Sequence, residues 1–292
     1  MNSYLNGREA YSTTGEVRYL DRLELYKSEK PYEVTFAPVN VKQPGARRTN
    51  FSLSYWDVAL RDLTSNRASF TTDVQGFELD KFPTSLSALQ LQDPDIVESL
   101  YHPEAINYLE HKYSAKKVLI FDTTIREARR PRQHSSKLLR NQQTLGVATD
   151  CHINLLEVFA VGSCIAYPTK LKNFLSSEFG IWRPLVWPYH TMPLAMCDWR
   201  STAPEDFTAS DHKTPIWEGE SLQVYYNPVH QWWFARTFAE DDVLLLKMYD
   251  SDAERDGSKT AMCTPHCSFD WKDAPHNTQA RQSMEIRALI FS

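Results

Sequence analysis

Short apolar runs with turn residues between them fill most of this chain. In residues 51–60 and 243–249, for example, aromatic, β-branched and leucine side chains crowd into a few positions. Such runs predict β-strands, and the acidic turn at 240–242 predicts a hairpin between residues 232–237 and 243–249. Further runs of this kind occupy residues 16–20, 32–36, 68–72, 118–121, 192–199, 222–226 and 284–291.

Two other stretches repeat apolar residues at helical spacing. The first is expected to begin at the N-cap Asp93, with Pro94 at the first helical position, and to continue to Leu109. The second is expected to begin at Thr169 and to end at Gly180, because glycine commonly follows a helix. Its apolar face would consist of Leu171, Phe174, Leu175 and Phe179.

A partly helical first half followed by many short strands indicates the fold class. It favours a mainly β protein of the α+β type, an antiparallel barrel or sandwich with helices packed outside. The chain has 292 residues, of which 42% are hydrophobic and 12% aromatic, which is enough for one large core. No linker divides the sequence, so we expect a single domain over residues 1–292 with an N-terminal extension of strands and a helix.

Net charge, hydropathy and cysteine content indicate which partners, metals and cellular location to expect. The net charge is −5, and the one local basic run, 126–140, is predicted to be a solvated loop, so no nucleic-acid surface is expected. The longest nearly uncharged apolar run, 158–167, is too short to span a membrane. Five cysteines, an odd number, favour reduced thiols and a cytoplasmic location. Cys263, His266 and Cys267 lack a fourth ligand for zinc.

One short stretch carries candidate metal chemistry. Alternate side chains of a strand point to the same side, so His152 and Asn154 would face one cavity. A His-x-Asp pair with a distant His is the ligand set of non-haem iron oxygenases, but in this chain Asn takes the place of the acid. His152 and Asn154 are therefore part of a metal site that has lost its acid, part of a pocket with another function, or a polar pair on a loop.

Several longer motifs carry a family resemblance through their order and spacing. Together with weaker matches at 48–50, 76–79 and 122, they span most of the chain. They resemble the AsaB-type hydroxylase/desaturase family of fungal secondary metabolism, which is related to cephalosporin methoxylation proteins and to fungal endoperoxide-forming oxygenases. The motifs are WRPL at 182–185, PLAMCDWRS at 193–201, NPVHQWWF at 227–234, DDVLLLKMYDS at 241–251, PHCSF at 265–269 and RQSMEIRALIF at 281–291.

The resemblance implies a double-stranded β-helix barrel, similar to jelly rolls and cupins, that holds iron(II) and 2-oxoglutarate. It places the first iron-binding histidine at His152 and the acid at Asn154. The second histidine falls at His266, because Arg281 follows it by fifteen positions. Arg281 and Ser283 match the 2-oxoglutarate motif, in which a guanidinium group binds a carboxylate.

Asn154 is the departure from the family pattern. A neutral carboxamide binds iron(II) far more weakly than a carboxylate. It is also nearly as large as Asp, so the site of the halogenating relatives, where a very small residue replaces the acid, is not expected. Loss of iron is the simpler inference, with no metal and no cofactor. A retained metal would be bound by His152, Asn154 and His266, with His230 as the competing candidate for the second histidine.

Within the family, the sequence resembles the hetero-Diels–Alderases of tropolone sesquiterpenoid pathways. This implies dehydration of a hydroxymethyl tropolone or phenol to an o-quinone methide, which then adds to a humulene-type sesquiterpene. His152 or His266 would assist proton transfer, and Asn154 and Arg281 would donate hydrogen bonds to the tropolone oxygens. Further substrate-binding candidates are His230, Ser283, Trp182, Trp232 and Trp233.

Two other functions stay open. The first is an iron(II)/2-oxoglutarate-dependent hydroxylase or desaturase of a terpenoid or polyketide, which is favoured by the retention of Arg281 and Ser283 and opposed by the loss of the acid. The second is a pseudoenzyme that binds a small molecule or a partner without catalysis. The sequence leaves the substrate pair, the stereochemistry and the oligomeric state open.

Overall fold

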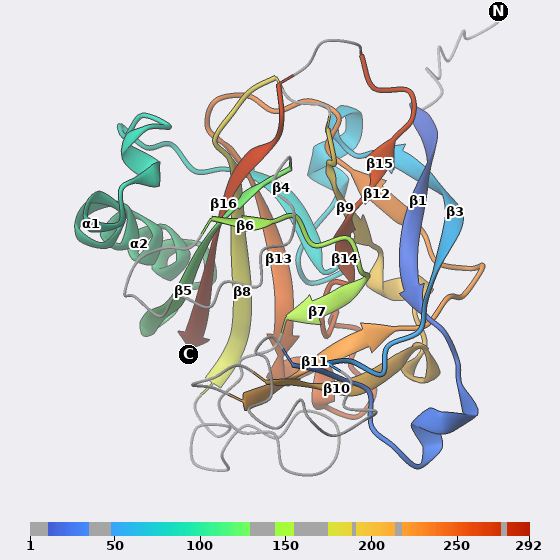
Figure 1. Ribbon diagram of the computed structural model, residues 1–292. Coiled ribbons are helices and arrows are strands. Elements are labelled where there is room, and N and C mark those ends of the chain that lie inside the picture. Colours follow the sequence, from blue (N-terminus) through green and yellow to red (C-terminus); the bar gives the residue numbers. More distant parts are fainter. Residues whose placement is uncertain are drawn as a thin grey trace, which may run out of the picture.

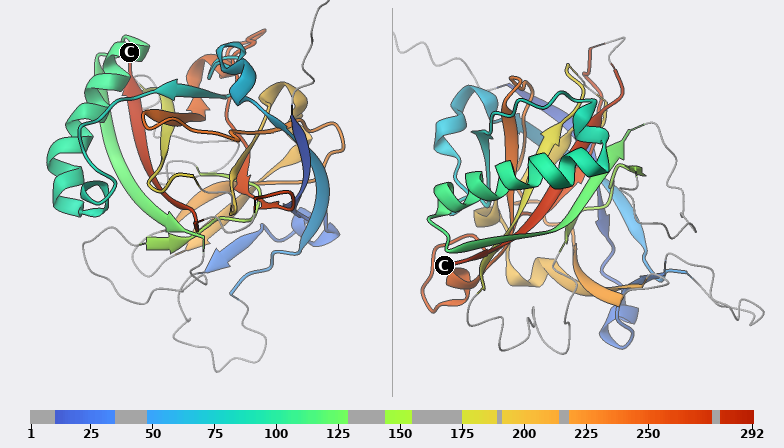
Figure 2. Two further views of the ribbon diagram at one scale, coloured as in Figure 1. Left: turned by 90° about the horizontal axis from the view of Figure 1, so that it is seen from above. Right: turned by 90° about the vertical axis from the view of Figure 1, so that its left-hand side faces the viewer.

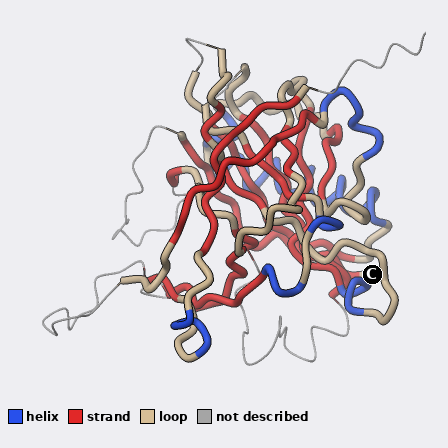
Figure 3. Tube along the Cα trace, turned by 90° about the vertical axis from the view of Figure 1, so that its right-hand side faces the viewer, coloured by secondary structure: helices blue, strands red, loops and turns tan. Residues whose placement is uncertain are grey.

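Two sheets make up most of the structure (Figure 1). The computed structural model describes residues 11–34, 48–128, 144–154, 175–188, 191–213, 218–275 and 279–292. In these residues a ten-stranded and a six-stranded sheet face one another, because apolar side chains from both sheets fill one shared core. Strands form the centre of the molecule, and short helical segments lie towards its outside (Figure 3).

The ten-stranded sheet carries the first candidate site residues. Its order is β15-β1-β3-β12-β9-β14-β7-β11-β10-β2, and most neighbours are antiparallel. Its strands are β1 (Ser12–Leu20), β2 (Tyr32–Val34), β3 (Leu53–Asp62), β7 (His152–Asn154), β9 (Leu194–Cys197), β10 (Phe207–Lys213), β11 (Glu218–Val224), β12 (Trp232–Phe234), β14 (His266–Ser268) and β15 (Asp270–Trp271).

The six-stranded sheet has the order β4-β13-β8-β16-β5-β6. The C-terminal strand β16 therefore lies inside the sheet, between β8 and β5, and pairs with both along most of its length. The strands are β4 (Phe77–Lys81), β5 (Lys117–Glu127), β6 (Thr144–Gly146), β8 (Leu175–Pro184), β13 (Asp242–Asp250) and β16 (Gln282–Phe291).

One helical segment covers the outer face of the six-stranded sheet (Figure 2). It runs through α1 (Pro94–Ile96), the π-helical turn η4 (Val97–Tyr101) and α2 (His102–Tyr113). As predicted, Asp93 caps it, and its side chain accepts hydrogen bonds from the backbone N–H groups of Asp95 and Ile96. The remaining helical segments are the short η1 (Glu24–Lys27), η2 (Thr64–Ser69), η3 (Gln90–Gln92), η5 (Trp199–Ser201), η6 (Pro204–Asp206) and η7 (Ser251–Glu254).

Strand alternation divides the six-stranded sheet into two faces. Met284 and Ile286 of β16 pack with Ala105 and Leu109 of α2 in one core cluster. Glu285, which lies between them in sequence, must point to the opposite face and therefore into the interior between the two sheets. The outer face of this sheet thus contributes to stability, and its inner face is available for a site.

Most of the predicted strands are confirmed, but three predictions are wrong. Residues 175–180 belong to strand β8 and not to a helix, because Phe179 and Ile181 pack against the helical segment while Trp182 points inward. Residues 169–174 lie outside the described part of the chain. Residues 68–72 form the end of η2 and a turn. The predicted hairpin does not form, since β12 and β13 belong to different sheets.

No helix in the described ranges is long and apolar enough to cross a membrane.

Replacing Leu109 by Ala tests the packing of α2 on the sheet. Leu109 is fully buried in the core cluster between α2 and the six-stranded sheet. We expect Leu109→Ala to lower the free energy of unfolding by about 2–5 kcal/mol, because the lost methyl groups leave a cavity. Denaturant titration followed by circular dichroism measures this change.

Leu100→Ala is the matched control on the same helical segment. Leu100 is 50% exposed, so its truncation should change the free energy of unfolding by less than about 0.5 kcal/mol. Equal destabilisation by the two substitutions would contradict the burial of Leu109 between α2 and the six-stranded sheet.

Candidate active site

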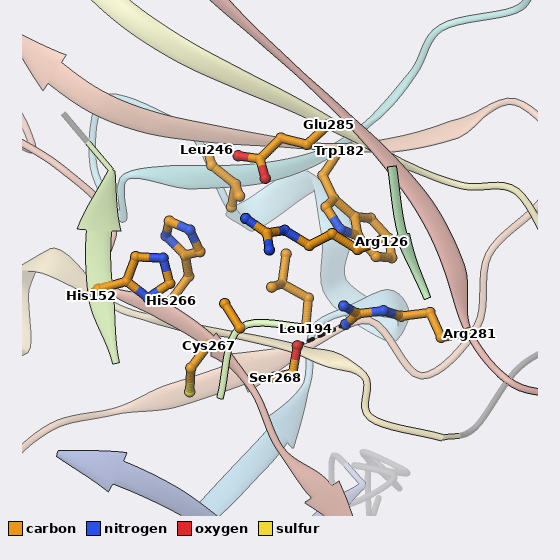
Figure 4. A pocket seen from close by; sticks show the side chains of 11 residues that line it. Arg126, His152, Trp182, Leu194, Leu246, His266, Cys267, Ser268, Arg281 and Glu285 are labelled. Atoms are coloured by element: carbon orange, nitrogen blue, oxygen red, sulfur yellow. Dashed lines mark hydrogen bonds between the residues drawn. The ribbon is translucent and has the colours of Figure 1, made fainter. Parts of the chain in front are cut away.

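A cavity lies between the two sheets (Figure 4). The open space between the side chains that line it is small. The described residues that line it are Arg126, Ala148, His152, Trp182, Leu194, Leu246, His266, Cys267, Ser268, Arg281 and Glu285.

Two imidazole groups meet on the ten-stranded sheet. His152 of β7 and His266 of β14 are directly paired across the strands, and their ring centroids lie 5.0 Å apart. The Nδ1 atom of His152 lies 2.6 Å from the carbonyl oxygen of Asp150, and that of His266 lies 2.9 Å from the carbonyl oxygen of Thr264. A carbonyl oxygen only accepts, so each Nδ1 carries a hydrogen, and in a neutral imidazole Nε2 then presents a lone pair.

Burial keeps His266 neutral. The side chain is 4% exposed, and desolvation lowers its pKa below the ordinary value although the nearby carboxyl group of Glu285 acts in the opposite direction. A neutral imidazole with a fixed Nδ1–H is a hydrogen-bond acceptor, a base or a metal ligand through Nε2.

Arg281 and Trp182 form another wall of the cavity. The Nη1 atom of Arg281 donates hydrogen bonds to the carbonyl oxygen of Met192 at 2.6 Å and to Oγ of Ser268 at 2.9 Å. Its guanidinium carbon lies 5.7 Å from the centre of the Trp182 ring. These contacts hold the guanidinium group in one orientation, ready to donate to an oxygen in the cavity.

Two polar atoms on the inner face of β16 have no hydrogen-bond partner among the described residues. They are Oγ of Ser283 and Oε1 of Glu285, and both are buried. Ser283, Glu285 and Arg281 occupy alternate positions and so share a face. A buried acceptor without a partner costs about 1–3 kcal/mol, and such atoms call for an explanation.

The structure does not bring every predicted site residue to this cavity. Trp232 is buried in a separate apolar cluster, where its Nε1 donates to Oη of Tyr19 at 2.8 Å. His230 contacts the same hydroxyl group at 3.2 Å, and its Nε2 lies 3.1 Å from a carboxyl oxygen of Asp206. Trp233 is partly buried against Phe70. These residues stabilise the fold beside the cavity and do not line it.

Sequence reasoning missed Arg126 and Glu285. The sequence predicts a solvated basic loop over 126–140, but Arg126 is part of β5 and lines the cavity; residues 129–140 lie outside the described ranges. Glu285 is two positions from Ser283 and four from Arg281, so alternation along this strand could have identified it. For Arg126 we find no comparable signal, because its place depends on the distant pairing of β5 with β16.

The side chains at the candidate metal site do not fit iron(II) well. The orientation of the two imidazole groups is suitable, since metal-bound histidines commonly donate their other N–H to a carbonyl group. However, the described His, Cys, Asp and Glu residues nowhere form a group of three that could hold a metal ion. Position 154 offers only a carboxamide, and its side chain lies outside the described part. Two imidazoles and an amide lack the anionic oxygen that iron(II) sites of this type use.

Comparison with solved structures identifies the fold. The structure of the iron and alpha-ketoglutarate-dependent endoperoxidase NvfI matches with a TM-score of 0.75 at 20% identity, covering 96% of this chain and 98% of that chain. Its W199F variant matches equally well, with a TM-score of 0.76. The predicted double-stranded β-helix is thereby confirmed.

Sequence comparison identifies the family. The model "YDMC: Oxidoreductase/YMDC permease-like domain" matches residues 17–291. The hydroxylase/desaturase efuI of Hormonema carpetanum is 28% identical over 80% of this chain and 83% of its own length. The Fe(II)/2-oxoglutarate-dependent dioxygenase nvfI of Aspergillus novofumigatus is 24% identical over 91% of both chains. The chain therefore belongs to the YDMC oxidoreductase/YMDC permease-like family and to the AsaB-type proteins of fungal secondary metabolism, which are related to iron(II)/2-oxoglutarate oxygenases.

Proposed function

We propose that this protein is a hetero-Diels–Alderase of fungal secondary metabolism that acts without metal or redox chemistry. The observation that carries the proposal is Asn at sequence position 154, where the family pattern has the acid, together with a cavity that both histidines and Arg281 line. Without a charged ligand the site binds a metal weakly. The two imidazole groups and Arg281 still converge on one small volume. The relatives named as oxygenases support the barrel and its pathway class, and the reaction is our inference.

The proposed substrates are a hydroxymethyl tropolone or phenol and a humulene-type sesquiterpene. The ring hydroxyl group loses its proton, the hydroxyl of the hydroxymethyl group takes up a proton and leaves as water, and the CH₂ carbon stays on the ring as the exocyclic carbon of an o-quinone methide. Its oxygen and its exocyclic carbon then form two bonds to an alkene of the terpene, which closes a dihydropyran ring. No electrons are gained or lost in the sequence, so no redox cofactor is required. We place this reaction in the cytoplasm, in line with the cysteine usage.

The side chains of the cavity supply orientation and proton transfer. Neutral His266, or His152 beside it, accepts a proton through Nε2, and Arg281 donates a hydrogen bond to a ring oxygen. Trp182 offers an apolar surface next to the guanidinium group. Holding two reactants in position can remove roughly 7–11 kcal/mol of barrier, and one positioned acid or base adds about 10²–10⁴-fold. Since the cavity has little free space, the side chains that line it must move when the reactants bind.

An iron(II)/2-oxoglutarate-dependent oxygenase is the second candidate function. The specific observation in its favour is that His152 and His266 both direct Nδ1–H to a carbonyl oxygen, as metal ligands do. Arg281 is also placed to bind a carboxylate. A binding protein without catalytic activity is the third candidate.

Metal content and metal removal distinguish the first two functions. Protein purified without a chelator should contain iron well below one atom per chain, because Asn154 supplies no negative charge. Treatment with EDTA should leave the rate and stereochemistry of the cycloaddition unchanged. Elemental analysis and product chromatography measure the two quantities.

Asn154→Asp is the matched variant for this experiment. It restores the acid of the metal-binding triad and should raise iron binding above that of the wild type. Stoichiometric iron in the wild type, together with succinate formed from 2-oxoglutarate on addition of substrate, would contradict the proposed function. A cycloaddition that runs equally fast and with the same stereochemistry in buffer would leave only binding.

Arg281→Gln should lower the rate of the cycloaddition by about a hundredfold, since it removes a preorganised donor to the developing charge. Its control is Arg183→Gln. Arg183 is also buried, but it bonds to the hydroxyl group of Tyr101 and to the backbone outside the cavity. We expect Arg183→Gln to lower stability and to keep the rate per folded molecule. Equal rate losses in both variants would show that Arg281 acts only through the fold.

A further inference from the structure

The carboxyl group of Glu285 is a buried acceptor that the proposed reaction has not used. The residue is 7% exposed, and its Oε1 has no hydrogen-bond partner in the described ranges. Its register partner on β8 is Trp182, and both side chains line the same cavity. The carboxyl group therefore points into the space where a ligand would lie (Figure 4).

Arg126 brings hydrogen-bond donors to the same part of the cavity. It belongs to β5, the other neighbour of β16, and its Nη1 donates to the carbonyl oxygen of Gly146 at 3.1 Å. Figure 4 shows its guanidinium group directed towards the carboxyl group of Glu285 and towards His266. An acceptor and a set of planar donors thus lie side by side on one wall.

This pair of groups is complementary to a particular ligand chemistry. A hydroxyl group can donate one hydrogen bond to Oε1 of Glu285, and a neighbouring oxygen can accept one from Arg126, since a guanidinium group has five N–H donors. A ring that carries a hydroxyl group next to a second oxygen substituent presents both at the spacing of adjacent ring positions. A hydrogen bond to a charged group is also stronger than one between neutral groups.

We propose that Glu285 and Arg126 form a two-point recognition site for the oxygen-bearing ring of the substrate. Oε1 of Glu285 accepts from the ring hydroxyl group, and Arg126 donates to the oxygen on the neighbouring substituent. The inference rests on the proposed function for the identity of the ring, a hydroxymethyl tropolone or phenol. It assigns Glu285 to substrate selection, a role separate from the metal-site positions and from Arg281.

A pair of small probes, with and without a ring O–H, isolates the proposed contact with Glu285. 2-(Hydroxymethyl)phenol carries both groups and is neutral at pH 7, since phenols ionise near pH 10. 2-Methoxybenzyl alcohol keeps the hydroxymethyl oxygen but has lost the ring O–H. Titration calorimetry in the presence of EDTA gives the affinity for each probe without any contribution from metal. We expect the wild type to prefer the phenol about tenfold, the value of one charged hydrogen bond.

The variants should change these affinities in different ways. Glu285→Met removes the acceptor and should bring the affinity ratio of the two probes close to one, whereas Glu285→Gln keeps a weaker acceptor and should give an intermediate ratio. Arg126→Met should weaken both probes and keep their ratio. The control is Glu78→Met on β4, where the carboxyl group pairs with Lys112 outside the cavity; it should change neither affinity.

Thermal unfolding separates recognition from a structural role. Replacing a buried acceptor without a partner by an apolar side chain of similar size should leave the melting temperature of Glu285→Met at or above the wild-type value. Equal affinities of the wild type for both probes, no binding of either probe, or an unchanged ratio in Glu285→Met would overturn the proposal.

The probe titration and the cycloaddition assay can fail independently of each other. A preference for the phenol that disappears in Glu285→Met supports the recognition site even if turnover proves to need iron. A metal-free cycloaddition in a protein that binds both probes equally supports the proposed reaction and overturns the recognition site.

Discussion

A single cross-strand pair fixes the position of both imidazole groups. His266 lies opposite His152, and the strands that carry them are held on their other sides by β9 and β11. A shift by one residue would turn the thiol groups of Cys151 and Cys267 towards the cavity and the imidazoles away from it. Both thiols are buried in an apolar cluster on the far face of the sheet, so burial of these cysteines and exposure of the histidines to the cavity depend on the same register.

Alternation along β16 places residues that stabilise the fold on one face and candidate site residues on the other. Met284 and Ile286 bury their side chains against α2, while Ser283 and Glu285 face the interior with Arg281 before them. In the part of the chain that the structure describes, Oγ of Ser283 and Oε1 of Glu285 have no hydrogen-bond partner, whereas the outer row is well packed. The strand is central in its sheet, so the apolar row can stabilise a polar row that would be costly on an isolated strand.

Local pattern was sufficient for part of the fold and the site. The Asp93 cap and the strand that ends the chain follow from local pattern, and the grouping of His152, His266 and Arg281 in one cavity follows from the family resemblance. The apolar residues of β8 also fit a helical face, and only the pairing of β8 with β13 and β16 decides for a strand. Adjacent Trp232 and Trp233 must point to opposite faces of β12, so the two could never have shared one wall.

Charge connects the loss of the acid with the rest of the cavity. The described lining contains two guanidinium groups, those of Arg126 and Arg281, and one carboxyl group, that of Glu285. The sequence has Asn at position 154, so this position supplies no negative charge. Guanidinium groups favour ligand oxygens that accept hydrogen bonds or carry negative charge, and they do not bind a divalent cation. In the proposed function, the amide at position 154 weakens the metal site, and the guanidinium groups of Arg126 and Arg281 bind the oxygens of the substrate ring.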